Sequence, residues 1–133
     1  PDMAYQYDGS AIVITQTATA DLSASQYELV MCDTANDSSV VVCAAVTDTP
    51  LGVLLNKPGA GEAATVLCAG VTKVATGAAV ANGALLGVDA TGRVVTQAPA
   101  NVNPVFGQAL TTSGGAGEII TAAINCLSSQ PGA

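Results

Sequence analysis

The chain has 133 residues, of which 50% are hydrophobic, 10% are charged and only 3% are aromatic. Ten acidic residues against three basic ones give a formal net charge of −7, and histidine is absent. This balance argues against a nucleic-acid partner or an anionic membrane partner, because both attract clustered lysine and arginine. The length fits a single domain with a core of its own, which must be built from Val, Ile, Leu and Ala.

The N-terminal segment is polar and reads PDMAYQYDGS over its first ten residues. We expect residues 1–15 to form an extended N-terminal arm, since such segments gain order when a neighbour holds them. Pro1 indicates that an initiator methionine was removed, and no basic segment followed by an apolar run predicts a signal peptide. We therefore expect synthesis in the cytoplasm. The longest apolar run, residues 40–46, is too short to cross a bilayer.

Short apolar segments alternate with turn signals along the rest of the chain, a pattern typical of a compact all-β barrel or sandwich. The sequence Asp89-Ala-Thr-Gly92 predicts the turn of a hairpin. At most one short helix is expected, with residues 76–83 as a candidate, and residues 128–133 are expected to form a frayed tail. The expected strands cover residues 11–16, 26–32, 40–46, 51–55, 63–69, 71–74, 84–88, 93–96, 105–110 and 118–124.

One glycine-rich segment occurs twice. The sequence GAGEAAT at residues 59–65 returns as GAGEIIT at residues 115–121, which is 56 positions later. A proline–glycine segment precedes both copies. We therefore predict a single β domain over residues 16–127 that contains a repeated strand–turn–strand unit, and we expect its two copies to superpose. The copies are residues 50–68 and 104–124.

The four cysteines have neither a C-x-x-C pair nor histidine beside them, and each lies in an apolar segment. Small buried thiols are the simplest interpretation. A four-cysteine zinc site has little support from the spacing, and disulfides are an alternative if the protein meets an oxidising medium. The residues are Cys32, Cys43, Cys68 and Cys126.

Carboxylates are the only other candidates for chemistry. Glu62 and Glu118 hold equivalent positions in the repeat, so they could act together as acid and base. The simpler interpretation is that each is a solvated residue at the start of a strand. Asp33, Asp37 and Asp48 do not have the spacing of an EF-hand calcium loop. We therefore predict no enzymatic activity, no metal and no cofactor.

The order of these motifs resembles the small capsid decoration (cement) proteins of tailed bacteriophages. The resemblance covers residues 26–125 and depends on order and spacing, since each motif alone consists of common small residues. The motifs are Pro50-Leu-Gly-Val53, Asn56-Lys-Pro-Gly-Ala-Gly-Glu62, Gly70-Val-Thr-Lys-Val74, Gly77-Ala-Ala-Val80, Gly83-Ala-Leu-Leu, Asp89-Ala-Thr-Gly-Arg93, Phe106-Gly-Gln-Ala109 and Ala116-Gly-Glu-Ile-Ile120.

The resemblance implies a β-tulip fold of the kind found in the head decoration protein of phage lambda. It also implies a homotrimer on the outer surface of an expanded icosahedral head, which bridges neighbouring subunits of the major capsid protein. Under this interpretation the protein belongs to the virion and works mechanically, without a cofactor. An assembly of this type would bury the apolar surface that so few charges protect.

The N-terminal arm is then the candidate capsid-binding segment, because an extended segment can add a strand to an exposed sheet edge. Tyr5 and Tyr7 are the expected anchors, since tyrosine combines a large apolar area with a polar tip. A tail without a partner is the alternative. The candidate residues are Pro1, Asp2, Met3, Ala4, Tyr5, Gln6 and Tyr7.

Two other classes of protein share the small β-barrel pattern. A biotinyl-type carrier or enzyme accessory domain needs a lysine at a tight hairpin tip. Here Lys73 lies within an expected strand and Lys57 precedes a proline. An adhesin or fibre subunit is the other alternative, and it would need secretion or a long shaft repeat.

Overall fold

The computed structural model describes residues 11–97, 103–128 and 130–131. It confirms the predicted all-β class, because these residues form strands and one 3-10 turn and contain no α-helix. The elements are β1 (Ile12–Ala18), β2 (Leu29–Cys32), β3 (Ser39–Val42), β4 (Gly52–Leu54), β5 (Ala63–Ala75), β6 (Leu85–Val88), β7 (Val94–Thr96), β8 (Pro104–Val105), β9 (Gly107–Ala109), β10 (Ile119–Asn125), η1 (Cys126–Ser128) and β11 (Gln130–Pro131).

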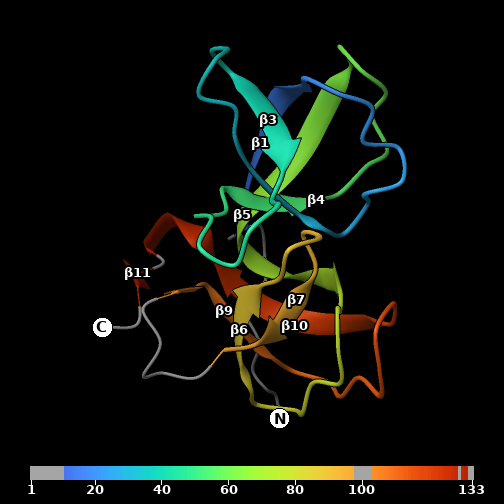
Figure 1. Cartoon of the computed structure of the whole chain (residues 1–133), viewed down its shortest axis with the longest axis vertical. Coiled ribbons are helices and arrows are strands. Elements are labelled where there is room, and N and C mark those ends of the chain that lie inside the picture. Colours follow the sequence, from blue (N-terminus) through green and yellow to red (C-terminus); the bar gives the residue numbers. More distant parts are fainter. Residues whose placement is uncertain (1–10, 98–102, 129, 132–133) are drawn as a thin grey trace, which may run out of the picture.

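The first half of the chain forms a closed five-stranded barrel, which occupies the upper part of Figure 1. Its strands follow the order β1-β3-β2-β4-β5, and β1 then pairs with β5 to close the ring. The β1–β3 pair is parallel and the other pairs are antiparallel. The barrel encloses a buried cluster of small apolar residues. Its members are Ala18, Leu22, Val30, Val40, Leu54, Ala64, Val66 and Cys68.

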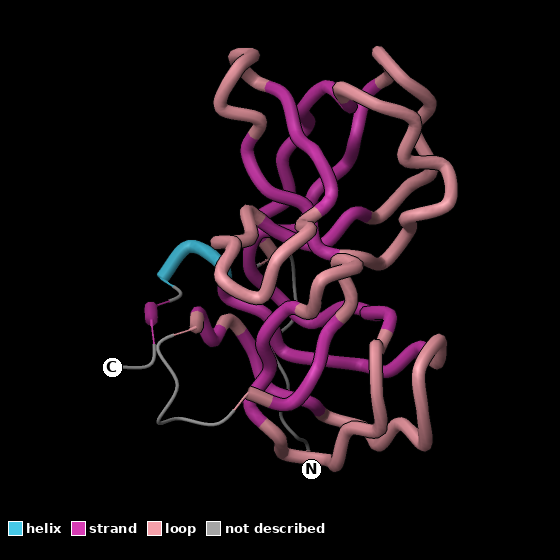
Figure 2. The backbone as a smooth tube through the Cα atoms, in the orientation of Figure 1, coloured by secondary structure: helices cyan, strands magenta, loops and turns pink. Residues whose placement is uncertain are grey.

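The second half of the chain builds a matching barrel below the first (Figure 1). It uses the end of β5 together with β10, β9, β6 and β7, in that order. A parallel bridge between Thr76 and Val94 closes this ring, and the Gly77 N–H donates to the Val94 carbonyl at 2.8 Å. Figure 2 shows the strands of the two barrels as two groups, with turns at the outer ends.

The long strand β5 belongs to both barrels. It has 13 residues, whereas the sequence predicted two strands separated at Gly70. Residues 63–69 pair with β1, and residues 69–75 pair with β10, so Ala69 has a partner on each side. These two ladders carry the strand through Gly70, which has φ +143°, and the β1–β5 register shifts beside it, between Ile12 and Val13. One continuous strand with an irregularity near the glycine therefore replaces the two expected strands.

Hydrogen bonds show that the two barrels are copies of one another. The Ala18 N–H donates to the Glu62 carbonyl at 2.9 Å, and the Thr76 N–H donates to the Glu118 carbonyl at 2.8 Å. The strand registers agree as well: β2–β4 pairs Leu29 with Val53, and β6–β9 pairs Leu85 with Gln108. Three further pairs of backbone bonds match, each from an N–H to a carbonyl. They are Tyr27 to Leu54 with Gly83 to Ala109, Gly61 to Ala18 with Gly117 to Thr76, and Leu55 to Thr65 with Leu110 to Thr121.

The duplication therefore extends over the whole β body. One copy runs from β1 to the first half of β5, and the second runs from the second half of β5 to β10. The predicted repeat, residues 50–68 and 104–124, is the closing strand–turn–strand part of each barrel. Both segments form an antiparallel pair across a glycine-rich turn.

Four segments differ from the expectation. Residues 12–15 of the expected arm belong to β1, because they pair with β5. Strand β3 ends at Val42, since the Asp48 carboxylate accepts from two successive N–H groups in residues 44–45 and turns the chain there. Residues 76–83 form bridges to β7 and to Ser113 instead of a helical turn. In the expected tail, β11 pairs with β8.

The two barrels dock through one face of the first. Leu29, Val53 and Leu67 form a cross-strand row on its outer side, and they are 0%, 0% and 5% exposed. All three belong to the same buried cluster as the core of the second barrel. Burying each leucine stabilises the fold by about 1.5–3 kcal/mol.

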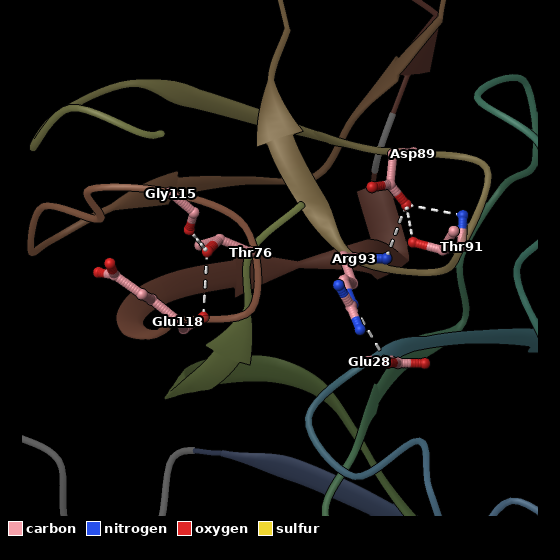
Figure 3. Close-up of polar contacts among 7 residues, drawn as sticks. All are labelled: Glu28, Thr76, Asp89, Thr91, Arg93, Gly115 and Glu118. Carbon is pink, nitrogen blue, oxygen red and sulfur yellow. Dashed lines mark hydrogen bonds and ion pairs between the residues drawn. The ribbon is translucent and has the colours of Figure 1, made fainter. Parts of the chain in front are cut away.

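Polar contacts reinforce this docking. The β6–β7 turn of the second barrel lies against β2, where the Leu29 N–H donates to the Gly92 carbonyl at 2.7 Å. Arg93 and Glu28 form an ion pair across the junction at 3.5 Å (Figure 3). The Asp89 carboxylate shapes the turn by accepting from the Thr91 N–H at 2.7 Å and the Arg93 N–H at 3.0 Å.

Replacement of Gly92 tests this junction. Gly92 has φ +84°, and an added Cβ would lie 2.6 Å from a Val42 methyl carbon of the first barrel. We expect Gly92→Ala to cost about 1–2 kcal/mol of backbone strain and about 1–3 kcal/mol more from the clash. Urea unfolding measures the loss. Gly83→Ala is the matched control, because Gly83 has φ +87° with open space around it, and equal losses for both variants would contradict the junction.

A buried hydroxyl holds the long turn of the second barrel. Thr76 is 0% exposed, and its hydroxyl lies 3.0 Å from the Ser113 hydroxyl. The same hydroxyl lies 3.0 Å from the carbonyls of Gly115 and Glu118 (Figure 3). We expect Thr76→Val to lower the free energy of unfolding by about 0.5–1.5 kcal/mol, because it removes the buried hydroxyl and its hydrogen bond, while the Glu118 carbonyl keeps the Thr76 N–H and the Gly115 carbonyl keeps the Ser113 hydroxyl. Thr17→Val, on the exposed side of β1, should change it by less than about 0.5 kcal/mol. Similar values for both variants would contradict this role.

Candidate functional surfaces

The predicted capsid-binding residues of the arm, numbers 1–7, lie outside the described residues. Their role therefore stays a prediction. The described chain begins at residue 11, immediately before β1. Removal of residues 1–10 would leave every strand of both barrels intact.

The structure does not pair Glu62 with Glu118. Each lies in the closing turn of a different barrel and is bound within that turn. Glu62 accepts from the Gly59 N–H at 2.6 Å, and Glu118 accepts from the Gly114 N–H at 3.0 Å. Figure 3 shows the Glu118 side chain pointing away from Thr76. Both glutamates therefore act as turn-forming residues, and this arrangement offers no acid–base pair.

Three of the four cysteines are buried as predicted, and Cys32 is exposed. Burial raises the pKa of Cys43 from 9.0 to about 12, with a further contribution from Asp48. Burial also raises the pKa of Cys126 to about 12. The expectation was wrong for Cys32, because it sits at the last position of β2, where the end of the first barrel is open.

The aspartates considered for calcium serve the turns. Asp33 accepts from Asn36 and from the Thr19 hydroxyl, and these bonds lower the pKa of its carboxyl. Asp48 binds the N–H groups of residues 44 and 45. In the part of the chain that the structure describes, no group of three His, Cys, Asp or Glu residues could hold a metal ion.

The basic side chains do not form a patch. Lys73 lies 5.9 Å from the centre of the Tyr27 ring, and Arg93 pairs with Glu28 between the barrels. Among the described residues, no helix has the length and apolar character needed to cross a membrane.

One open, partly apolar region lies on the outer face of the second barrel. Leu85, Gln108 and Ala123 form a cross-strand row there, which continues to Val71 on β5. Leu85 is 37% exposed and Val71 is 44% exposed. A shallow depression of about 360 Å³ includes this row. We call Leu85, Gln108 and Ala123 the docking row, and the sequence analysis did not select any of them.

The end of the first barrel is also open. Two depressions of about 490 and 300 Å³ meet at Cys32, and the larger one includes Met31 and Leu51. The smaller one includes Gln16, whose side-chain oxygen is buried and has no hydrogen-bond partner. We call Gln16, Cys32 and Leu51 the open end. A buried oxygen without a partner is costly, so a hydrogen-bond donor that reaches Gln16 would stabilise this end.

Comparison with known proteins establishes a shared fold. No protein-family model matches this chain, and no curated protein is similar to it. A solved structure, the N base of the head fiber gp8.5 of bacteriophage phi29, superposes with a TM-score of 0.67 at 22% sequence identity. The match covers 87% of this chain and 95% of that one. The tandem arrangement of strands is therefore a fold that a known phage protein also has.

Thiol reactivity checks the burial of the cysteines. At pH 8 the raised pKa of Cys43 and Cys126 leaves about a thousandfold less reactive thiolate than an ordinary thiol would have. We expect both to react with a thiol reagent only after unfolding, at a rate that follows global unfolding. Mass spectrometry of labelled peptides, with and without urea, measures this. Labelling of either residue in the folded protein within seconds would contradict the structure.

Proposed function

We propose that this chain is a non-enzymatic structural protein of a phage virion that binds the outer surface of an expanded icosahedral head. The observation that carries the proposal is the fold shared with the N base of a phage head fiber. The order of sequence motifs supports the same class independently. A mechanical role requires a rigid body with binding surfaces, and two barrels that share a strand provide one.

The surface chemistry favours assembly. Only 10% of the residues are charged, and large apolar side chains are exposed on both barrels. Where exposed apolar side chains lie next to one another, they mark sites where partners bind. We propose that the chain forms a homotrimer and bridges neighbouring subunits of the major capsid protein. The exposed apolar residues are Ile12, Val13, Val46, Val71, Leu85, Leu110, Ile119 and Leu127.

The N-terminal arm is the proposed capsid anchor. It precedes β1 directly, so a partner that binds the arm would hold the first barrel close to the capsid. Tyr5 and Tyr7 are the proposed anchor side chains, since each could bury its ring while keeping the hydroxyl hydrogen-bonded.

A fibre base is the second candidate function. It is favoured by the structural neighbour, which is the N base of a head fiber. In that case the barrels would attach to the head in the same way and would carry a fibre shaft. A fibre base and a decoration protein differ in what the bound chain supports, not in the attachment step.

Co-sedimentation with undecorated, expanded phage heads tests the attachment. We expect the full chain to sediment with heads at saturation and the variant lacking residues 1–10 to bind at least tenfold more weakly, a loss of about 1.4 kcal/mol or more. Tyr5→Ala with Tyr7→Ala should give a similar loss if the tyrosines are the anchors.

The deletion leaves β1 complete, so circular dichroism should show an unchanged fold. Unchanged binding after the deletion would move the contact to the barrels and would contradict the anchor. No binding to expanded or unexpanded heads of any host tested would contradict the proposed function itself.

A further inference from the structure

Because the two barrels are copies of one another, each surface of the first barrel has an equivalent on the second. The junction between the barrels buries the outer row of the first barrel, but not the equivalent row of the second. On the first barrel, the row Leu29, Val53 and Leu67 is covered by the second barrel. The strand registers place the docking row of the second barrel at the equivalent positions. None of the described residues covers that row completely, since Leu85 is 37% exposed.

The residues of the second barrel that pack against this row also have equivalents in the first barrel. In the second barrel, Val74, Val88 and Phe106 are 0–2% exposed and share one buried cluster with Leu29, Val53 and Leu67. The equivalent residues of the first barrel are the open end, Gln16, Cys32 and Leu51. Here Cys32 is exposed, and Gln16 and Leu51 are half-buried. The docking row and the open end are therefore equivalent to the two sides of the junction between the barrels. Inside the chain that junction is buried, whereas the docking row and the open end are not paired with each other.

We propose that the docking row of one chain packs onto the open end of a second copy of the same chain. The proposal rests on the self-association described under the proposed function and names the surfaces that would make it. The two surfaces are different, so the contact is head-to-tail. Such contacts close into rings when the rotation between copies allows it, and three tandem chains would place six barrels in one ring.

The chemistry of the two surfaces agrees with this pairing. Where the internal junction has Val53 and Val74, the uncovered surfaces have Gln108 and Gln16. The buried oxygen of Gln16 lacks a donor. The Gln108 amide donates one hydrogen bond, to the Gly83 carbonyl at 2.9 Å, and a carboxamide carries two donors. Two valines inside the chain are thus replaced by two glutamines between chains, and the pairing requires the Gln16 side chain to turn toward Gln108 of the second copy.

The turns contribute differently to the two contacts. The β2–β3 turn has Ser38 where the β6–β7 turn has Gly92, and both have positive φ. The side chain of Ser38 prevents the close approach that Gly92 makes to Val42. The contact between chains therefore depends on the docking row and the open end rather than on this turn.

Two variants test the head-to-tail contact in the full chain. Ala123→Arg adds a charge to the docking row, and Cys32→Arg adds one to the open end. Sedimentation equilibrium should give an assembled wild-type chain and a monomer for each variant alone. An equal mixture of the two variants should give a 1:1 dimer. The intact docking row of the Cys32→Arg chain can then pack onto the intact open end of the Ala123→Arg chain.

Thr15→Arg is the matched control, since Thr15 is exposed on β1 at the position where the second barrel has Lys73. It should assemble like the wild type. Wild-type chain that stays monomeric up to millimolar concentration would overturn the proposal. Single variants that keep the wild-type assembly would overturn it, and so would monomeric variants that fail to combine.

Thiol labelling gives a second measurement on the unmodified chain. Cys32 should be protected as concentration rises and assembly proceeds, and Ala123→Arg should restore its reaction rate to the monomer value. A Cys32 rate independent of assembly would overturn the proposal even if a variant failed to fold. Head binding is measured separately, so a monomer that still sediments with heads would overturn this contact and the homotrimer, and would leave the proposed head binding intact.

Discussion

The burial of one cross-strand row organises this molecule. Leu29, Val53 and Leu67 face outward from the first barrel, yet they are covered because they complete the core of the second. Strand β5 makes this possible by supplying the last strand of one barrel and the first strand of the other. Without that row the chain would be two small barrels on a shared strand, each with an uncovered apolar side.

Rigidity follows from how the turns are held. In both barrels a carboxylate shapes the turn between the second and third strands, as Asp33 and Asp89 do. A second carboxylate, Glu62 or Glu118, closes the glycine-rich turn. These four carboxylates are therefore used for local structure, and they hold the turns at the ends of both barrels. The exposed apolar residues are left as the contact surface.

Composition and turn signals predicted the all-β class, the hairpin at Asp89, and the repeated glycine-rich unit. The continuous β5 could not be predicted, because Gly70 signals a break unless strands pair on both sides of it. The docking row was missed for a related reason. Leu29 and Leu85 are the same residue type at equivalent positions, and only the packing of the barrels makes one buried and the other exposed. Extending the repeat alignment beyond residues 50–68 and 104–124 would have paired them.

The central claim is that two fused barrels form a head-binding unit whose uncovered surfaces join copies to one another. Electron cryomicroscopy of expanded heads saturated with the protein tests it most directly. The account predicts tandem barrels on the outer surface, with the second barrel of each chain against the open end of the first barrel of its neighbour. Bare heads, or bound chains whose docking rows face solvent, would contradict it.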